Sequence, residues 1–304
     1  MQSKATSTLF AGCEVGGTKC VCVIGTGPQD IRAETRIPTT TPEETISRII
    51  QFLSDAQKSF GPFAALGIAT FGPIDLHPNS PTFGFITTTP KPGWTFTDFL
   101  GPFKRHFPIP IAFDTDVNGA ALGEWRWGAA RNLNSFIYLT VGTGIGGGGM
   151  MGSRLMHGLI HPEMGHILLR RPTHETFTGI CPFHQDCLEG LASGPAIQAR
   201  WGHSPDSLPP DHPAWTLEAE YLAQALHTFI CTLSPQRIIL GGGVMQRAHL
   251  FPLIRERVRE SLNGYIAHPA ILHTLDEYIV PPALGTRSGA LGALALAERA
   301  AHRP

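Results

Sequence analysis

Two neighbouring motifs, HPEMGH from residue 161 and CPFHQDCLEG from residue 181, combine histidine, cysteine and acidic side chains. Cys181, His184 and Cys187 recur every third residue, a spacing that lets one tight turn direct three ligands to a single ion. His166, upstream of these three, supplies a fourth ligand. Two thiolates and two imidazoles suit tetrahedral Zn²⁺, and four protein ligands characterise a structural site. The motifs therefore predict a structural zinc site, with surface histidines and buried thiols as the alternative.

Other histidine, cysteine and aspartate residues are not assigned to the predicted zinc site. His161 adjoins Pro162 and His174 lies in a polar stretch, so we expect both to be solvent-exposed or hydrogen-bonded, and Asp186 is a spare candidate. The remaining cysteines have apolar neighbours and are expected to be buried thiols. They are Cys13, Cys20 and Cys22 in an early strand and Cys231 in a helix.

A pair of aspartates, Asp114 and Asp116, follows the apolar run IPIAF, where extended chain gives way to a helix of small residues. Binding sites in α/β proteins open at strand ends, so at least one aspartate is expected to be functional. Phosphoryl transfer needs a carboxylate that accepts or orients the proton of the acceptor hydroxyl. Asp116 fits that role, and the alternative is a helix N-cap.

Three glycine-rich turns, EVGGTK, TVGTGIGGG and LGGGVM, each follow a β-rich run. Glycine lets the backbone bring its N–H groups against phosphate oxygens. The pattern G-x-x-x-x-G-K-[ST] is absent, and no G-x-G-x-x-G opens a helix after the first strand. Because β-rich sequence resumes after the first two turns, each of these turns is expected to join the strands of a hairpin, the first over residues 9–24. The turns are candidate phosphate loops, and the alternative for each is an ordinary tight β-turn. The candidate residues are Gly16, Gly17, Thr18, Lys19, Thr140, Gly142, Thr143, Gly144, Gly241, Gly242 and Gly243.

Elements that position these residues follow from hydrophobic periodicity. Apolar residues at helical spacing predict a helix over 42–60. Further helices are expected at 187–200, 216–232, 247–262 and 286–301. Strands alternate with helices in both halves of the chain, which predicts an α/β fold of two similar lobes that meet across a cleft.

Composition limits the classes of partner. The 304 residues carry a formal charge of −1 with 15% charged side chains, so the strong positive charge typical of nucleic-acid binding is missing. No long apolar run marks a membrane span, and the first residues do not resemble a signal peptide. We expect a soluble, cytoplasmic protein without nucleic-acid or membrane partners.

The order of the motifs EVGGTK, GPID, DTDVNGAALGE, TVGTGIGGG, HPEMGH, CPFHQDCLEG and LGGGVM resembles the ROK family of sugar kinases and repressors. With these motifs, the long loop at 79–94 is more similar to bacterial fructokinases than to glucokinases. The resemblance implies a two-lobed actin-like ATPase (ribonuclease H-like) fold. It places the first lobe at 1–115, completed by the helix at 286–301, and the second at 116–285.

The same resemblance implies roles for individual residues. Asp116 would be the catalytic base, and Mg²⁺ would bind near Glu14. The first two glycine turns would hold the phosphates of ATP, and the third would lie near adenosine. The hexose, D-fructose first, would contact Thr115, Glu163, His166, Glu189, Gly72 and Pro73. His166 would serve both the structural Zn²⁺ and the sugar, and the protein would form a homodimer.

The chain departs from the family pattern at three places. Glu14 replaces the usual Asp, Thr115 replaces Asn, and C-x-x-H-x-x-C replaces C-x-C-G-x-x-G-C. The Thr115 change alters a direct sugar contact and puts glucose in doubt as the substrate. A kinase for another hexose, such as mannose, glucose or an N-acetylhexosamine, is an alternative to a fructokinase. A sugar-responsive repressor or sensor is the alternative of another class. A repressor would need a DNA-binding domain, whereas only 13 residues precede Glu14.

Overall fold

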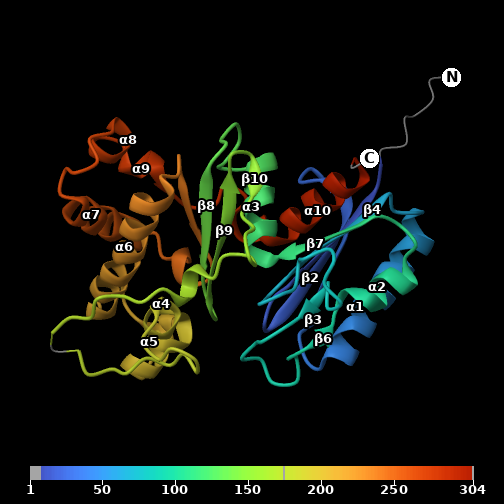
Figure 1. Cartoon of the computed structure of the whole chain (residues 1–304), viewed down its shortest axis with the longest axis horizontal. Helices are drawn as coiled ribbons and strands as arrows, with labels where there is room; N and C mark the ends of the chain where they lie inside the picture. Colours follow the sequence, from blue (N-terminus) through green and yellow to red (C-terminus); the bar gives the residue numbers. More distant parts are fainter. Residues whose placement is uncertain (1–7, 174, 303–304) are drawn as a thin grey trace. The chain divides into compact units, whose positions relative to one another are not determined.

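The computed structural model describes residues 8–173 and 175–302 (Figure 1). His174, for which an exposed or hydrogen-bonded ring is predicted, lies outside the described residues. Within the described part of the chain, every helix is too short or too polar to cross a bilayer.

The chain forms two compact units. Unit 1 comprises the chain up to Arg131, the segment His157–His161 and the chain from Arg287 onward, whereas unit 2 comprises Asn132–Met156 and Pro162–Thr286. The boundary expected after residue 115 differs from this division. The helix that begins there belongs to unit 1, because it packs against the C-terminal helix.

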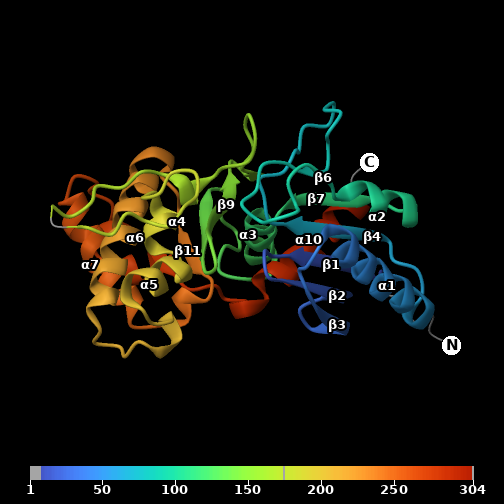
Figure 2. The same ribbon diagram turned by 90° about the horizontal axis from the view of Figure 1, so that it is seen from below.

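Unit 1 is built on a mixed five-stranded sheet in the order β3-β2-β1-β4-β7. β1, β2 and β3 are successive antiparallel neighbours, which Figure 2 shows side by side, and β4 and β7 continue the sheet in parallel. The hairpin expected over residues 9–24 is therefore present as β1 and β2. The strands are β1 Phe10–Val15, β2 Lys19–Gly27, β3 Asp30–Pro38, β4 Ala65–Thr70 and β7 Ile111–Thr115, with the short pair β5 Phe85–Ile86 and β6 Thr97–Asp98 in the long loop.

Helices cover both faces of this sheet. The described helices of unit 1 are α1 Pro42–Phe60, α2 Leu100–His106, α3 Asp116–Trp127 and α10 Ser288–Ala301. Ile49 of α1 and Ile68 of β4 share one buried cluster, whereas Phe10 of β1 and Leu294 of α10 share another. Alternate residues of a strand point to opposite faces of the sheet. In β1, Phe10 therefore belongs to one buried cluster and Ala11 to the other. The predicted helix over 42–60 is confirmed with both bounds.

Two glycines allow α10 to lie very close to its neighbours. A Cβ atom at Gly67 in β4 would stand 1.9 Å from the carbonyl oxygen of Ala293 in α10. A Cβ atom at Gly292 would stand 1.9 Å from the carbonyl oxygen of Gly119 in α3. Interiors pack too tightly to absorb such overlaps, so any side chain at these positions would displace α10. The close packing fixes α3, the helix that begins with Asp116.

Unit 2 repeats the strand order of unit 1 as β10-β9-β8-β11-β12. β8, β9 and β10 are antiparallel neighbours, and β11 and β12 run parallel to β8. A glycine turn joins the two antiparallel strands β8 and β9, just as one joins β1 and β2. The predicted α/β fold of two similar lobes is confirmed. The strands are β8 Phe136–Val141, β9 Ile145–Met151, β10 Arg154–Leu155, β11 Ile238–Gly241 and β12 Ile279–Val280.

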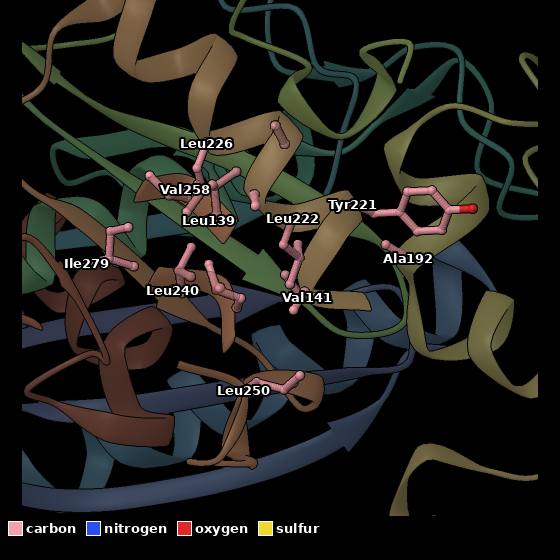
Figure 3. Close-up of a cluster of buried hydrophobic side chains, with 14 of the residues drawn as sticks. Leu139, Val141, Ala192, Tyr221, Leu222, Leu226, Leu240, Leu250, Val258 and Ile279 are labelled. Atoms are coloured by element: carbon pink, nitrogen blue, oxygen red, sulfur yellow. The ribbon is translucent and has the colours of Figure 1, made fainter. Parts of the chain in front are cut away.

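The core of unit 2 lies between its sheet and two long helices. The described helices of unit 2 are α4 Leu188–Ala192, α5 Gly194–Trp201, α6 Pro213–Leu233, α7 Leu250–Leu262, α8 Pro269–Leu272 and α9 Leu275–Tyr278. Figure 3 shows Leu222 and Leu226 of α6 and Val258 of α7 gathered with Leu139 and Leu240 of adjacent strands. These buried contacts hold β8, and hence the glycine turn that follows it, in a fixed position.

The prediction of a single helix over 187–200 was wrong, because the structure has two helices there, α4 and α5, which are separated at Ser193. Ser193 has extended dihedral angles, and its hydroxyl accepts from the N–H of Ala196 at 3.3 Å. Pro195 supplies no N–H and is disfavoured inside a helix but suited to its first turn. The chain therefore ends one helix and caps the next.

The expectation of a buried thiol was also wrong for Cys231, which is exposed, whereas Cys13, Cys20 and Cys22 are buried as expected. Cys231 lies three residues after Thr228, which is likewise exposed, on the outward face of α6. Apolar neighbours in the sequence do not reveal which side of a helix faces the core.

Candidate active site and metal cluster

The turn between β1 and β2 contains the first predicted phosphate loop. The N–H of Gly16 donates to the carbonyl oxygen of Lys19 at 3.0 Å, and Gly17 and Thr18 are exposed at the tip. Thr39 engages two carbonyl groups of the turn: its hydroxyl donates to Gly16 O at 2.8 Å, and its N–H donates to Thr18 O at 3.0 Å. These two bonds hold the turn in place beneath its exposed tip, which is the candidate anion-binding part. Sequence analysis missed Thr39, since nothing in its spacing marks it.

Glu14 and Asp116 are carboxylates within electrostatic reach of each other. Strand register aligns Glu14 with Ala69 of β4, and Ala69 with Asp114 of β7, two residues before Asp116. Desolvation raises the pKa of Asp116 from 3.8 to about 6. Desolvation first, and the charge of Asp116 second, raise the pKa of Glu14 to about 7. A divalent cation would relieve this repulsion, because carboxylate oxygens are the ligands that Mg²⁺ prefers.

The two aspartates of the DTD motif differ in their surroundings. Asp114 is buried, and its Oδ1 accepts from the N–H of Thr115 at 2.8 Å and from the side-chain amide of Asn118 at 2.9 Å. Nε2 of His157 lies 2.9 Å from Asp114 Oδ2. Asp116 is only half-buried at the first residue of α3. Asp114 therefore holds the start of α3 in place, and His157 and Asn118 are partners that sequence analysis missed.

Other sugar-site candidates of unit 1 lie after β7 and β4. Thr115 Oγ1 caps α3 by accepting from the N–H of Asn118 at 3.2 Å, and a hydroxyl that accepts in this way still has a hydrogen to donate. The Gly72–Pro73 turn lies against the buried ring of His161, whose Nε2 accepts from the N–H of Ile74 at 3.0 Å. The hydrogen-bonded alternative predicted for His161 is thus confirmed.

The second predicted phosphate loop joins β8 to β9. The N–H of Gly142 donates to the carbonyl oxygen of Gly144 at 2.9 Å, which closes the turn. Two groups from the α4–α5 segment hold it: Glu189 Oε2 accepts from the N–H of Ile145, and the N–H of Gly194 donates to Gly142 O, each at 2.8 Å. This predicted loop and the predicted sugar-binding Glu189 are therefore in direct contact.

The third glycine turn packs against the end of β8. Gly241 ends β11, and Gly242 has a φ of 92°. A Cβ atom at Gly242 would stand 2.3 Å from the carbonyl oxygen of Val141, so only glycine fits. The second and third glycine turns are thus neighbours within unit 2. Thr140 is half-buried in β8, and Thr143 is exposed at the tip of the second turn.

The predicted metal ligands form one cluster. Ligand atoms of His166, Cys181, His184 and Cys187 all lie within 4.8 Å of one another. Nδ1 of His166 is 3.8 Å from Cys181 Sγ and 3.5 Å from Cys187 Sγ. Nδ1 of His184 is 3.7 Å from Cys181 Sγ. Ligands of a tetrahedral zinc ion at ordinary bond lengths are about 3.3–3.8 Å apart, so the four residues fit Zn²⁺.

His166 faces the metal cluster with one ring nitrogen and two carboxylates with the other. Its Nε2 lies 4.0 Å from Glu163 Oε2 and 4.0 Å from Glu189 Oε1. The three sugar-binding candidates of unit 2 are therefore one group, adjacent to the metal cluster. An ion bound at Nδ1 would fix the orientation of the ring toward both carboxylates.

Ion pairs fasten the loop that carries the metal ligands. Asp186, the spare candidate, is outside the cluster and pairs with Arg171 at 3.2 Å. Glu175 forms a partly buried ion pair with Arg200 of α5 and accepts from the hydroxyl of Tyr221 in α6 at 3.0 Å. The chain between His166 and Cys181 is thereby tied to the helices of unit 2.

The two mixed sheets with the same strand order define the actin-like ATPase class of fold. Its structure matches the ROK hexokinase of Thermus thermophilus with a TM-score of 0.75 and 26% identity, covering 96% of this chain and 98% of that one. Residues 10–300 match the ROK family. The chain belongs to the ROK family.

Two relatives that are more than 40% identical to this chain are named fructokinases. The fructokinase of Pediococcus pentosaceus is 44% identical over 292 residues, which cover 96% of this chain and 98% of that protein. The fructokinase of Zymomonas mobilis subsp. mobilis is 43% identical over 297 residues, which cover 96% and 97%.

Proposed function

We propose that the protein is an ATP-dependent fructokinase that converts ATP and D-fructose to ADP and D-fructose 6-phosphate. The two named fructokinases, 44% and 43% identical across 96% of this chain, support the substrate. The structural observation that carries the proposal is Asp116, a half-buried carboxylate at the start of α3 whose pKa is raised to about 6. A base with this pKa is ionised at neutral pH and still accepts a proton effectively.

Asp116 accepts the proton of the attacking sugar hydroxyl. As the proton leaves, the hydroxyl oxygen bonds to the γ-phosphorus and the bond from that phosphorus to the leaving oxygen of ADP breaks. The N–H of Val117 donates to Asp116 Oδ1 at 2.9 Å and holds the carboxylate in one orientation. Asp114 supports the same segment from within the protein, through its bonds to Thr115 and Asn118.

We assign the phosphates of ATP to the first two glycine turns, where exposed backbone and threonine hydroxyls offer donors. The residues of these turns are Gly16, Gly17, Thr18, Lys19, Thr140, Gly142, Thr143 and Gly144. The third turn, at 241–243, is assigned to adenosine. Bound Mg²⁺ would offset the charge of the phosphates. Glu14 is the residue we assign to it, because desolvation first and the charge of Asp116 second raise the pKa of its carboxylate, and a bound cation would favour the ionised form.

Sugar hydroxyls are assigned to Glu163, His166 and Glu189, with Thr115 and the Gly72–Pro73 turn. Carboxylates accept and imidazole can accept or donate, which suits the directional hydrogen bonds of a polyol. The 4.0 Å separations of His166 from both carboxylates support a shared role.

The metal cluster fits a structural zinc site held by His166, Cys181, His184 and Cys187. Burial raises the pKa of the Cys187 thiol to about 11, so a thiolate there needs a bound cation. The ion would order the loop and orient His166, and it would take no part in the transfer. A homodimer stays a prediction of the family resemblance, which light scattering tests.

A coupled assay of ADP release with a panel of hexoses tests the proposed function. We expect kcat/KM to be highest with D-fructose, and lower with mannose, glucose and N-acetylmannosamine. If another hexose is preferred, the proposed kinase activity stands and the proposed substrate is wrong. If no hexose is turned over, the proposal is wrong as a whole.

A further inference from the structure

We propose that Glu189 is a positioning residue that connects the metal cluster to the second glycine turn, so that metal occupancy controls nucleotide affinity as well as sugar affinity. The inference rests on the proposed function, because it takes the turn between β8 and β9 as part of the nucleotide site. It goes beyond that function by giving Glu189, assigned above to sugar, a second role toward the nucleotide.

The two carboxylate oxygens of Glu189 face different partners. Oε2 accepts from the N–H of Ile145 at 2.8 Å, at the end of the glycine turn, and Oε1 lies 4.0 Å from Nε2 of His166. The carboxylate closes directly over the turn, since a Cβ atom at Gly144 would stand 2.6 Å from Oε2. One side chain thus joins a metal-ligand candidate to the backbone of the turn.

A second contact holds the other end of the same turn. The N–H of Gly194 donates to the carbonyl oxygen of Gly142 at 2.8 Å. A Cβ atom at Gly194 would stand 3.1 Å from that oxygen, so the approach is close. The turn from Gly142 to Ile145 is therefore held at both ends by one short segment of chain, from Glu189 to Gly194.

This segment begins at a metal ligand. Cys187 immediately precedes α4, and its carbonyl oxygen accepts from the N–H of Leu191 at 3.0 Å. Two residues further on, the N–H of Ser193 donates to the carbonyl oxygen of Glu189 at 3.1 Å. Leu188 and Leu191 are buried, which packs the segment against the core of unit 2. A shift of Cys187 would therefore move Glu189 with it.

Metal binding would add a further constraint on this segment, beside the packing of Leu188 and Leu191. An ion bound to Cys187 and His166 would fix the start of α4 and the ring that faces Glu189. Without it, the carboxylate loses its fixed position and the N–H of Ile145 loses a charged acceptor. Loss of one charge-assisted hydrogen bond corresponds to about tenfold or more in an equilibrium constant.

Calorimetric titration with Mg·ADP in the absence of sugar tests the proposal. The samples are the zinc-loaded protein, the chelator-treated protein, Glu189→Ala and Glu189→Gln, each with its zinc content and melting temperature measured. We expect Kd to rise about tenfold after zinc removal and in Glu189→Ala. Glu189→Gln should stay within about twofold of the parent, because its amide oxygen can still accept from Ile145, while its KM for fructose rises.

Hydrogen exchange provides a measurement that needs no variant. Zinc removal should speed exchange of the Ile145 amide, whereas the amides of β11 stay protected. Unchanged protection of Ile145, or an unchanged Kd in zinc-loaded Glu189→Ala, would overturn the proposal. A parent protein that does not bind Mg·ADP would instead defeat the proposed function, so the two failures are distinguishable.

Discussion

Nε2 of His157 lies 2.9 Å from Oδ2 of Asp114, and this contact ties a five-residue segment, His157–His161, into unit 1 although the chain on either side of it belongs to unit 2. We expect His157→Ala to lower the free energy of unfolding by about 1–3 kcal/mol, because a buried carboxylate loses a partner. Turnover should fall as well, since Asp114 supports the segment that presents Asp116. Urea denaturation and kcat measure the two effects.

The matched control is His157→Gln, whose side-chain amide can still donate to Asp114. It should retain more stability than His157→Ala. Equal losses in the two variants would show that packing of the ring, and not its hydrogen bond, matters at this position.

Asp116→Asn should separate activity from stability. We expect kcat to fall by at least about 10²-fold, because the proton acceptor is lost. Stability should rise at pH 8 by about 1–3 kcal/mol, because a carboxylate whose pKa is raised to about 6 is costly to ionise in the folded state. The gain should shrink as pH falls through 6 toward the unfolded value of 3.8. Melting temperatures across this range test the prediction, and a variant less stable than the parent at pH 8 contradicts it.

The pH dependence of turnover should report the raised pKa of Asp116. The ionised carboxylate is the active form, so kcat at saturating Mg·ATP and fructose should fall as pH drops through about 6. An ordinary aspartate would give this acidic limb near 3.8. A profile that stays flat down to pH 5 would count against Asp116 as a desolvated base.

His166→Ala should lose bound zinc and sugar affinity together, because its two ring nitrogens face the metal cluster and the carboxylates. Metal analysis and the KM for fructose measure the two losses. Cys187→Ser should also weaken zinc binding and raise the KM, since Glu189 lies two residues beyond it. Asp186→Asn is the control: Asp186 adjoins Cys187 but pairs with Arg171, so zinc should be retained. Full zinc retention in His166→Ala would exclude the shared role.

Local patterns accounted for much of the fold. The helix over 42–60 was predicted with its bounds, because its apolar spacing is readable from neighbouring residues. The division of 187–200 at Ser193 was missed, although Ser193 and Pro195 carry the local signal for a new helix start. The unit boundary differed from the expected one because it depends on packing of α3 against α10, which lie far apart in the sequence.

By itself, the sequence determined the glycine turns, the DTD motif and the four cluster residues. Three of these four lie in one short stretch whose spacing restricts how they can be arranged. Tertiary structure decided the surroundings of Asp114, because its burial and the approach of His157 depend on segments remote in sequence. It also exposed Cys231 and brought Thr39 to the first turn. Such contacts arise when distant segments exclude water together, and no local pattern encodes which partners will meet.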